Sequence, residues 1–286
     1  MQHPCFGTMH AADHAAAIAE RAGRLDPGFK HVVGIGGDHD SGPYHQPPPA
    51  SPVGKPTAGQ HWQETKRFGD VSNKPIARFL DPDRSGSLTH RCRQQRNEEF
   101  KRRFPQLAEM RVLDLGGTAV SWRVAGLRAK SVTIVNLDRS DDPEESWMET
   151  VQGDACVGDF GKYDLVFSNS VLEHVGGHGR RQQFADVVQN SAPLWWVQTP
   201  YRYFPIEPHW LFPGFQFLPF RARVLVTQHW NVGHNPVLKD EREAAALVAS
   251  TELVSATEMR TYFPGGEIWF ERIAALPKSI VAFKNV

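Results

Sequence analysis

Three acidic side chains follow or end apolar runs of the sequence, in an order that suits a nucleotide-like ligand. Asp114 lies near the end of the run at 111–115, just before two consecutive glycines, which let a ligand approach the backbone with no Cβ in the way. Asp138 ends the next apolar run, where a carboxylate can accept hydrogen bonds from both ribose hydroxyls. Asp154 follows a further short strand and is placed to accept from a donor such as an adenine amino group.

The glycine turn differs from the turn of dinucleotide-binding proteins. Gly116 and Gly117 are followed by Thr118, and no third glycine stands where the G-x-G-x-x-G pattern needs one to hold a pyrophosphate. Asp114 would also place a negative charge close to a pyrophosphate. A cationic ligand therefore suits the turn better, and a nicotinamide dehydrogenase is the disfavoured alternative.

These positions resemble class I S-adenosylmethionine-dependent methyltransferases over about residues 111–286. The run 114–118 matches the glycine motif of that family, although the usual D-x-G-x-G is D-x-G-G-T here, with the second glycine displaced. The stretch 167–175 looks like the motif that lines the methionyl end of the cofactor. The resemblance implies S-adenosyl-L-methionine as cofactor, held by Asp114, Gly116, Gly117, Thr118, Asp138, Asp154, Ala155, Ser168 and Asn169.

A second stretch, residues 198–210, is more distinctive. Together with the D-x-G-G-T form, it is similar to an actinobacterial subgroup that includes a mycobacterial sugar 1-O-methyltransferase of methylmannose polysaccharide synthesis. This closer resemblance implies a small polar acceptor, with a saccharide hydroxyl as the methylated group. Residues 1–60 lie outside it.

Methyl transfer to an alcohol needs a base for the hydroxyl proton, and three histidines follow predicted strands. His209 lies two residues from Glu207 in a proline-stiffened segment, and we predict it as the base; the alternative is that the two residues only order the loop. His174, directly after Glu173, is a second candidate base or a cofactor contact, unless it is a structural histidine. His178 lies between glycines and is the least favoured.

Aromatic residues are dense between 195 and 220. We predict Trp195 and Trp196 as core, in a strand covered on both faces. The later aromatics stand among prolines and cannot form one regular helix. They are expected to cap the acceptor pocket, or else to form a partner interface.

No metal site is predicted. The sequence has no H-E-x-x-H or comparable spacing of ligands, and its three cysteines are scattered. If the reaction used a metal, oxygen-bound Mg²⁺ would be the expected kind.

Alternating strand and helix patterns predict the fold. Residues 180–190 have helical spacing between two strands, which implies parallel strands joined by right-handed crossovers. Two late strands are only a few residues apart, which favours an antiparallel hairpin. With the resemblance, the prediction is an α/β, Rossmann-like fold whose mostly parallel seven-stranded sheet ends in a C-terminal antiparallel hairpin. The predicted strands lie at 111–115, 132–137, 164–167, 194–197, 267–273 and 279–283.

Composition divides the chain into three parts. Residues 1–60 are rich in Pro and Gly and are predicted to be a disordered leader, residues 61–110 a helical segment, and residues 111–286 the cofactor-binding domain. The 32 basic and 32 acidic residues cancel, which argues against a general nucleic-acid or membrane partner. No apolar run approaches the ~18 to 20 residues that a membrane helix needs, and no secretory signal is apparent, so we expect a soluble cytoplasmic protein. Nothing in the sequence indicates an oligomeric state.

Two other functions stay open at this point. One is a methyltransferase of a lipid or phenolic acceptor, with which the proline-aromatic segment is also compatible. The other is a non-catalytic module that binds the cofactor, which the displaced glycine favours.

Overall fold

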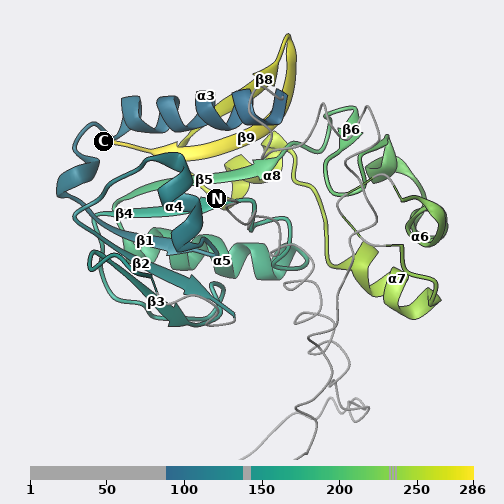
Figure 1. Cartoon of the computed structure of the whole chain (residues 1–286), viewed down its shortest axis with the longest axis horizontal. Coiled ribbons are helices and arrows are strands. Elements are labelled where there is room, and N and C mark those ends of the chain that lie inside the picture. Colours follow the sequence, from purple (N-terminus) through teal and green to yellow (C-terminus); the bar gives the residue numbers. More distant parts are fainter. Residues whose placement is uncertain (1–87, 138–142, 232, 234, 236) are drawn as a thin grey trace, which may run out of the picture.

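A computed structural model describes residues 88–137, 143–231, 233, 235 and 237–286 of the 286-residue chain (Figure 1). The predicted leader, the part of the helical segment before residue 88, and Asp138 lie outside the described residues. The predicted division into three parts therefore stays a prediction.

Seven strands form one sheet in the order β3-β2-β1-β4-β5-β9-β8. Strands β1 to β5 pair in parallel, whereas β9 runs antiparallel to both β5 and β8. The predicted mostly parallel sheet with a C-terminal antiparallel hairpin is therefore confirmed. The strands are β1 (Arg111–Leu115), β2 (Ser131–Asn136), β3 (Met148–Gln152), β4 (Leu165–Asn169), β5 (Leu194–Pro200), β8 (Glu267–Ile273) and β9 (Leu276–Lys284).

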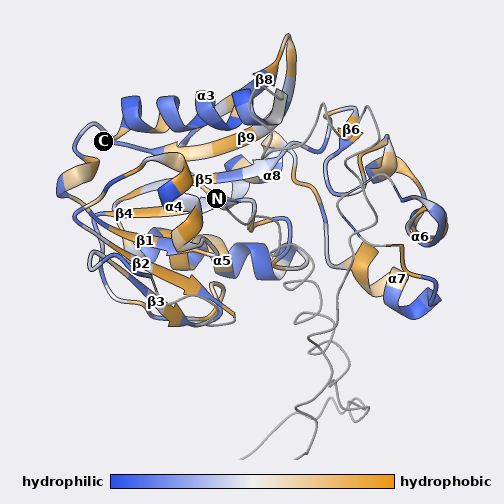
Figure 2. Cartoon of the chain, in the orientation of Figure 1, coloured by the Kyte–Doolittle hydropathy of each residue, from blue (hydrophilic) through white to orange (hydrophobic). Residues whose placement is uncertain are grey.

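Helices cover both faces of the sheet (Figure 1). The helix α3 (Leu88–Arg103), the short 3-10 helix η2 (Leu107–Glu109) and α4 (Ala119–Ala125) share one core with one face. The helices α5 (His178–Ser191) and α8 (Ala256–Tyr262) share the other. The strands in the middle of the sheet are largely apolar, and the helices that cover them carry many polar residues, as the colouring in Figure 2 shows.

The two adjacent tryptophans of strand β5 are buried on opposite faces of the sheet. Successive side chains of a strand point to opposite faces. Trp195 packs in the core under α5 and α8, whereas Trp196 packs in the core under α3, with its ring centroid 5.3 Å from that of Phe100. The prediction that both tryptophans are core residues is confirmed.

A smaller lobe lies between β5 and α8 in the chain and has a core of its own. In that core the ring of Trp210 stacks on Phe215 at 4.1 Å between centroids, and both residues are buried. These aromatics are therefore lobe core rather than a cap on a pocket. The lobe consists of β6 (Ile206–Glu207), β7 (Phe212–Pro213), η3 (Phe215–Phe217), α6 (Phe220–His229) and α7 (Glu241–Ala249).

Among the described residues, no helix combines the length and the apolar character needed to cross a membrane.

Candidate active site

The turn after β1 depends on its two glycines. Gly116 has a φ of 81°, a left-handed conformation that side chains rarely adopt, and a Cβ on it would lie 2.5 Å from Cγ2 of Val171. A Cβ on Gly117 would overlap the carboxylate of Asp114. The turn therefore needs one glycine for its backbone angle and the other for close approach.

Asp114 lies inside this turn. It is fully buried, and Nε1 of Trp122 donates a hydrogen bond of 2.7 Å to its Oδ2. Burial raises the pKa of Asp114 to about 7, and the hydrogen bond from Trp122 opposes that shift only in part. In this position the carboxyl group shapes the turn; its contact with a cofactor stays a prediction.

Two other predicted cofactor residues use their side chains within the protein. Oγ1 of Thr118 accepts the N–H of Ser121 at 3.1 Å and so caps α4. The hydroxyl of Ser168 is fully buried and donates to the carbonyl oxygen of Leu115 at 2.9 Å, which ties β4 to β1. Any contact that Thr118 makes with a ligand would therefore be expected through its backbone.

Asn169 offers an unsatisfied acceptor at the carboxyl end of β4. Its Oδ1 is buried and receives no hydrogen bond from the described residues. Strand β4 is the neighbour of β1, so this atom and the glycine turn belong to the same edge of the sheet. In open parallel sheets that edge is where ligands bind.

Asp154 has a partner that the sequence analysis missed. Nη2 of Arg180 lies 2.7 and 2.8 Å from its two carboxylate oxygens, and the N–H of Cys156 donates to Oδ1 at 3.0 Å. Ala155 packs partly buried against the core on the α5 side. Arg180 stands in the predicted helix 180–190, but only the fold shows that it reaches Asp154.

Glu207 and His209 form a close pair in the lobe. Glu207 is 1% exposed, and its Oε2 accepts the backbone N–H groups of His209 and Trp210, both at 2.8 Å. Its Oε1 lies 2.6 Å from Nδ1 of His209. A carboxylate next to Nδ1 holds the ring proton on that nitrogen, which leaves a lone pair on Nε2.

His174 and Glu173 lie against this pair. The His174 ring meets the His209 ring edge-on, with centroids 4.9 Å apart. Nε2 of His174 is 3.9 Å from Oε1 of Glu173, and the Oε2 of Glu173 accepts a hydrogen bond of 2.9 Å from Thr199. The structure thus joins all three predicted catalytic residues, His209, His174 and Glu207, and adds Glu173.

The charges in this cluster shift two pKa values. Burial alone would lower the pKa of His209, but the charge and hydrogen bond of Glu207, with the charge of Glu173, outweigh burial and raise it. Burial raises the pKa of Glu173 to about 6, against the opposing effects of His209 and Thr199. His209 in this cluster therefore binds its second ring proton more tightly than a histidine in water does.

His178 is not part of the cluster. It is exposed at the start of α5, where its Nδ1 lies 2.8 Å from the hydroxyl of Tyr262 in α8. The contact joins the two helices that cover one face of the sheet.

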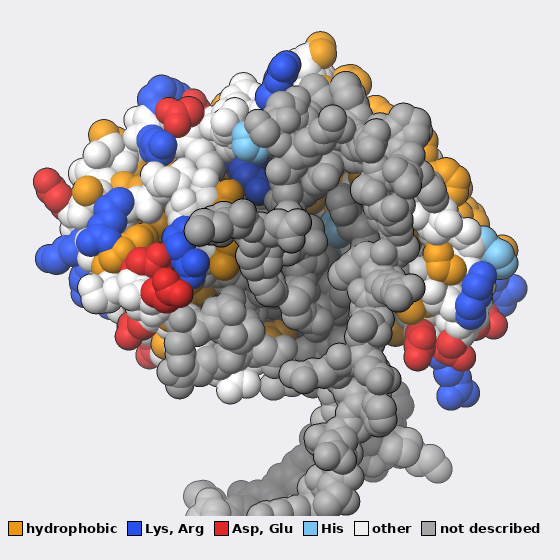
Figure 3. All heavy atoms as spheres, viewed as in Figure 1, with side chains coloured by type: hydrophobic (Ala, Val, Ile, Leu, Met, Phe, Trp, Pro, Cys, Tyr) orange, Lys and Arg blue, Asp and Glu red, His pale blue; other side chains and the backbone are white. Residues whose placement is uncertain are grey.

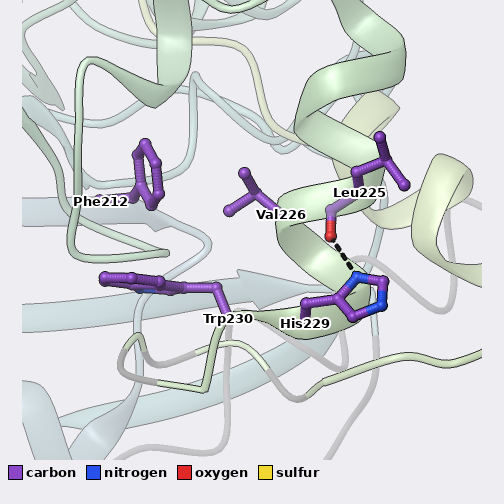
Figure 4. A pocket seen from close by; sticks show the side chains of 5 residues that line it. All are labelled: Phe212, Leu225, Val226, His229 and Trp230. Carbon is purple, nitrogen blue, oxygen red and sulfur yellow. Dashed lines mark hydrogen bonds between the residues drawn. The ribbon is translucent and has the colours of Figure 1, made fainter.

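A separate apolar pocket of about 260 Å³ lies in the lobe (Figure 4). Nδ1 of His229, one of the lining residues, lies 2.9 Å from the carbonyl oxygen of Leu225, so this histidine is tied to its own helix. None of the predicted site residues that the structure describes lines the pocket. Its lining residues are Phe212, Leu225, Val226, His229 and Trp230.

Three solved structures align with parts of this chain at low identity. The N-methyltransferase NodS from Bradyrhizobium japonicum, in complex with S-adenosyl-L-homocysteine, aligns with 73% of this chain and 96% of its own, at 13% identity and a TM-score of 0.42. The N-terminal domain of EvdMO1, in the presence of S-adenosyl-L-homocysteine and D-fucose, aligns with 70% of this chain and 85% of its own, at 15% identity and a TM-score of 0.42. A chain assigned as a Zn-dependent alcohol dehydrogenase from Rhodobacter sphaeroides aligns with 67% of this chain and 89% of its own, at 11% identity and a TM-score of 0.44.

No family model and no curated protein matches the sequence. The sheet itself supplies the class of fold, because its parallel strands end in the antiparallel pair β9 and β8. This is an α/β, Rossmann-like fold.

Proposed function

We propose that this protein is an S-adenosylmethionine-dependent O-methyltransferase that acts on a hydroxyl group of a small polar acceptor. The observation that carries the proposal is the Glu207–His209 pair, with 2.6 Å between Oε1 and Nδ1. Glu207 orients the ring so that Nε2 of His209 can accept the hydroxyl proton. A base positioned in this way contributes about 10² to 10⁴-fold to a rate.

The carboxyl edge of the sheet suits the cofactor. The half-buried glycine turn at Gly116 and Gly117 lies at this edge, and the unsatisfied Oδ1 of Asn169 is an acceptor for a cationic ligand. Asp154 and Asp138 are proposed to bind its adenine and ribose. When bound there, S-adenosyl-L-methionine supplies an electrophilic methyl group.

A saccharide is the acceptor that we propose first. The resemblance of residues 198–210 to the sugar-methylating subgroup supports it. So does an exposed aromatic pair, in which the rings of Tyr203 and Phe217 stack at 6.1 Å and present flat apolar faces. Acidic and basic side chains are interspersed on the described part of the face in Figure 3, which gives a polyanion no continuous basic surface there.

The first experiment is a calorimetric titration of S-adenosyl-L-homocysteine into wild type and Asp138→Ala. We expect micromolar binding that Asp138→Ala abolishes. Binding to neither protein would overturn the proposal. A screen of sugars against phenols, with labelled methyl donor, then identifies the acceptor class.

The base is tested with His209→Ala. We expect turnover to fall by about 10² to 10⁴-fold while S-adenosyl-L-homocysteine still binds. Intact turnover would show that His209 is not the base. Tight cofactor binding without transfer to any acceptor would instead favour the non-catalytic module, to which the displaced glycine points.

A further inference from the structure

Two loops at the carboxyl edge of the sheet bring a carboxylate and two imidazoles together. One donor atom from each of Glu173, His174 and His209 lies within 4.8 Å of the other two. We propose that these three side chains bind a divalent transition-metal ion, with Zn²⁺ as the reference ion. This inference goes beyond the proposed function, since ion binding can be measured without methyl transfer.

Glu173 supplies the clearest sign of a missing positive partner. Its side chain is fully buried, and Oε2 accepts a hydrogen bond from Thr199. The other oxygen, Oε1, is buried and receives no hydrogen bond from the described residues. A buried carboxylate oxygen in this state is costly, and an ion bound at Oε1 would remove that cost.

The charges around the cluster point the same way. Elsewhere in the protein the buried Glu271 has Arg96 at 3.4 Å. Glu173 and Glu207 are equally buried, but among the described residues the ion pairs of both involve only histidines, namely His174 and His209. Buried charges are usually paired or coordinate metals, and two carboxylates beside two imidazoles are a typical environment for a divalent cation.

The histidines are oriented as metal ligands usually are. A metal-bound histidine commonly gives its second ring nitrogen to a carboxylate or another polar group. Nδ1 of His209 has Glu207 at 2.6 Å, and Nδ1 of His174 has Oγ1 of Thr251 at 3.4 Å. Nε2 of His174 lies 3.9 Å from Oε1 of Glu173, and Nε2 is the ring nitrogen of His209 that the contact with Glu207 leaves for an ion.

The donor set selects the kind of ion. Two imidazoles and one carboxylate suit Zn²⁺ and neighbouring first-row ions, whereas Mg²⁺ prefers oxygen ligands alone. Three protein ligands leave a position open for water or for an acceptor oxygen. An ion in the site would use the lone pair on Nε2 of His209. His209 therefore cannot act as the base of the proposed function while an ion is bound to it.

The test is a titration of ZnCl₂ into the full chain after chelator treatment. We expect one Zn²⁺ per chain and a loss of affinity of at least about 100-fold in Glu173→Gln and in His209→Asn. His178→Asn is the matched control, because His178 lies outside the cluster, and should bind as wild type does. MgCl₂ should bind at least about 100-fold more weakly.

A second measurement needs no variant and so does not depend on whether one folds. X-ray absorption of the Zn²⁺-loaded wild type should show two imidazole nitrogens at about 2.0 to 2.1 Å and an oxygen ligand. Sulfur ligands, fewer than two imidazoles, no binding, or binding that Glu173→Gln and His209→Asn leave unchanged would each overturn the inference. A parallel titration of S-adenosyl-L-homocysteine reports on the proposed function separately.

Discussion

Asp114, in strand β1, and Glu173, just after the neighbouring strand β4, are both fully buried acids. The residues around the two carboxyl groups differ. Asp114 receives a hydrogen bond from Trp122 and packs against Gly117, all within a few residues of its own turn. Glu173 is held by Thr199, which comes from the next strand, and faces His174 with an oxygen that accepts no hydrogen bond from the described residues.

The comparison separates two uses of a buried carboxyl group. The surroundings of Asp114 favour its neutral form, and the group stabilises the shape of a backbone turn. The surroundings of Glu173 place it next to imidazoles that can carry positive charge or bind an ion. Asp114 thus has a hydrogen-bond partner close to its own turn, whereas Glu173 is the acid that we propose to bind an ion beside two histidines.

Gly117→Ala should have the largest effect on the Asp114 side. The added methyl group overlaps the Asp114 carboxylate, so we expect a loss of about 2 to 3 kcal/mol in the free energy of unfolding, with cofactor binding lost as the turn moves. Denaturant unfolding and calorimetry measure the two effects. Gly179→Ala is the control, because a Cβ there meets nothing within 4 Å. Unchanged stability and binding in Gly117→Ala would show that the turn does not depend on this packing.

The pH dependence of stability should report on Asp114. Since folding raises the pKa of its carboxyl from 3.8 to about 7, the folded protein binds the proton more tightly than the unfolded chain. The contribution to stability is therefore full below about pH 4 and is lost as the pH rises to about 7, at roughly 1.4 kcal/mol per unit.

Asp114→Asn isolates this contribution. Its carbonyl oxygen can still accept from Trp122, and it has no charge to bury. We expect the variant to be more stable than wild type at pH 8 and to lose that part of the pH dependence in unfolding titrations. A variant that is less stable than wild type at pH 8 would contradict the assignment.

Glu207→Gln tests the other side of the comparison. The Gln carbonyl oxygen can keep the two backbone hydrogen bonds, but its NH₂ group then faces Nδ1 of His209 and forces the ring proton onto Nε2. We expect transfer and Zn²⁺ affinity each to fall by about 10 to 100-fold, with S-adenosyl-L-homocysteine affinity and melting temperature unchanged. Equal losses of cofactor binding would indicate a role in folding of the lobe instead.

Tyr203→Ala should have the smallest effect. The Tyr203 ring is exposed, stacks on the exposed Phe217 and meets the half-buried Tyr201 edge-on, so stability should change by no more than about 0.5 kcal/mol. If the pair binds a sugar, the KM for that acceptor rises several-fold while kcat and cofactor affinity stay the same. An unchanged KM for the acceptor would remove the pair from the acceptor site.

Much of the fold could be predicted from the sequence, because its signals are local. The strands Arg111–Leu115 and Glu267–Ile273 have the predicted bounds, since a run of apolar or alternating residues specifies a strand without reference to distant parts of the chain. The same holds for Trp195 and Trp196, whose adjacency requires a strand with two covered faces.

What the tertiary structure alone decided is which side chains meet. The sequence determined that His209, His174 and Glu207 follow strands, but only the structure shows that Glu173 lies in the cluster with both histidines and that its Oε2 accepts a hydrogen bond from Thr199 of β5. Arg180 reaches Asp154 for the same kind of reason. Contacts of this sort depend on loops and strands far apart in the chain, and no local pattern of residue types encodes the direction in which a side chain finally points.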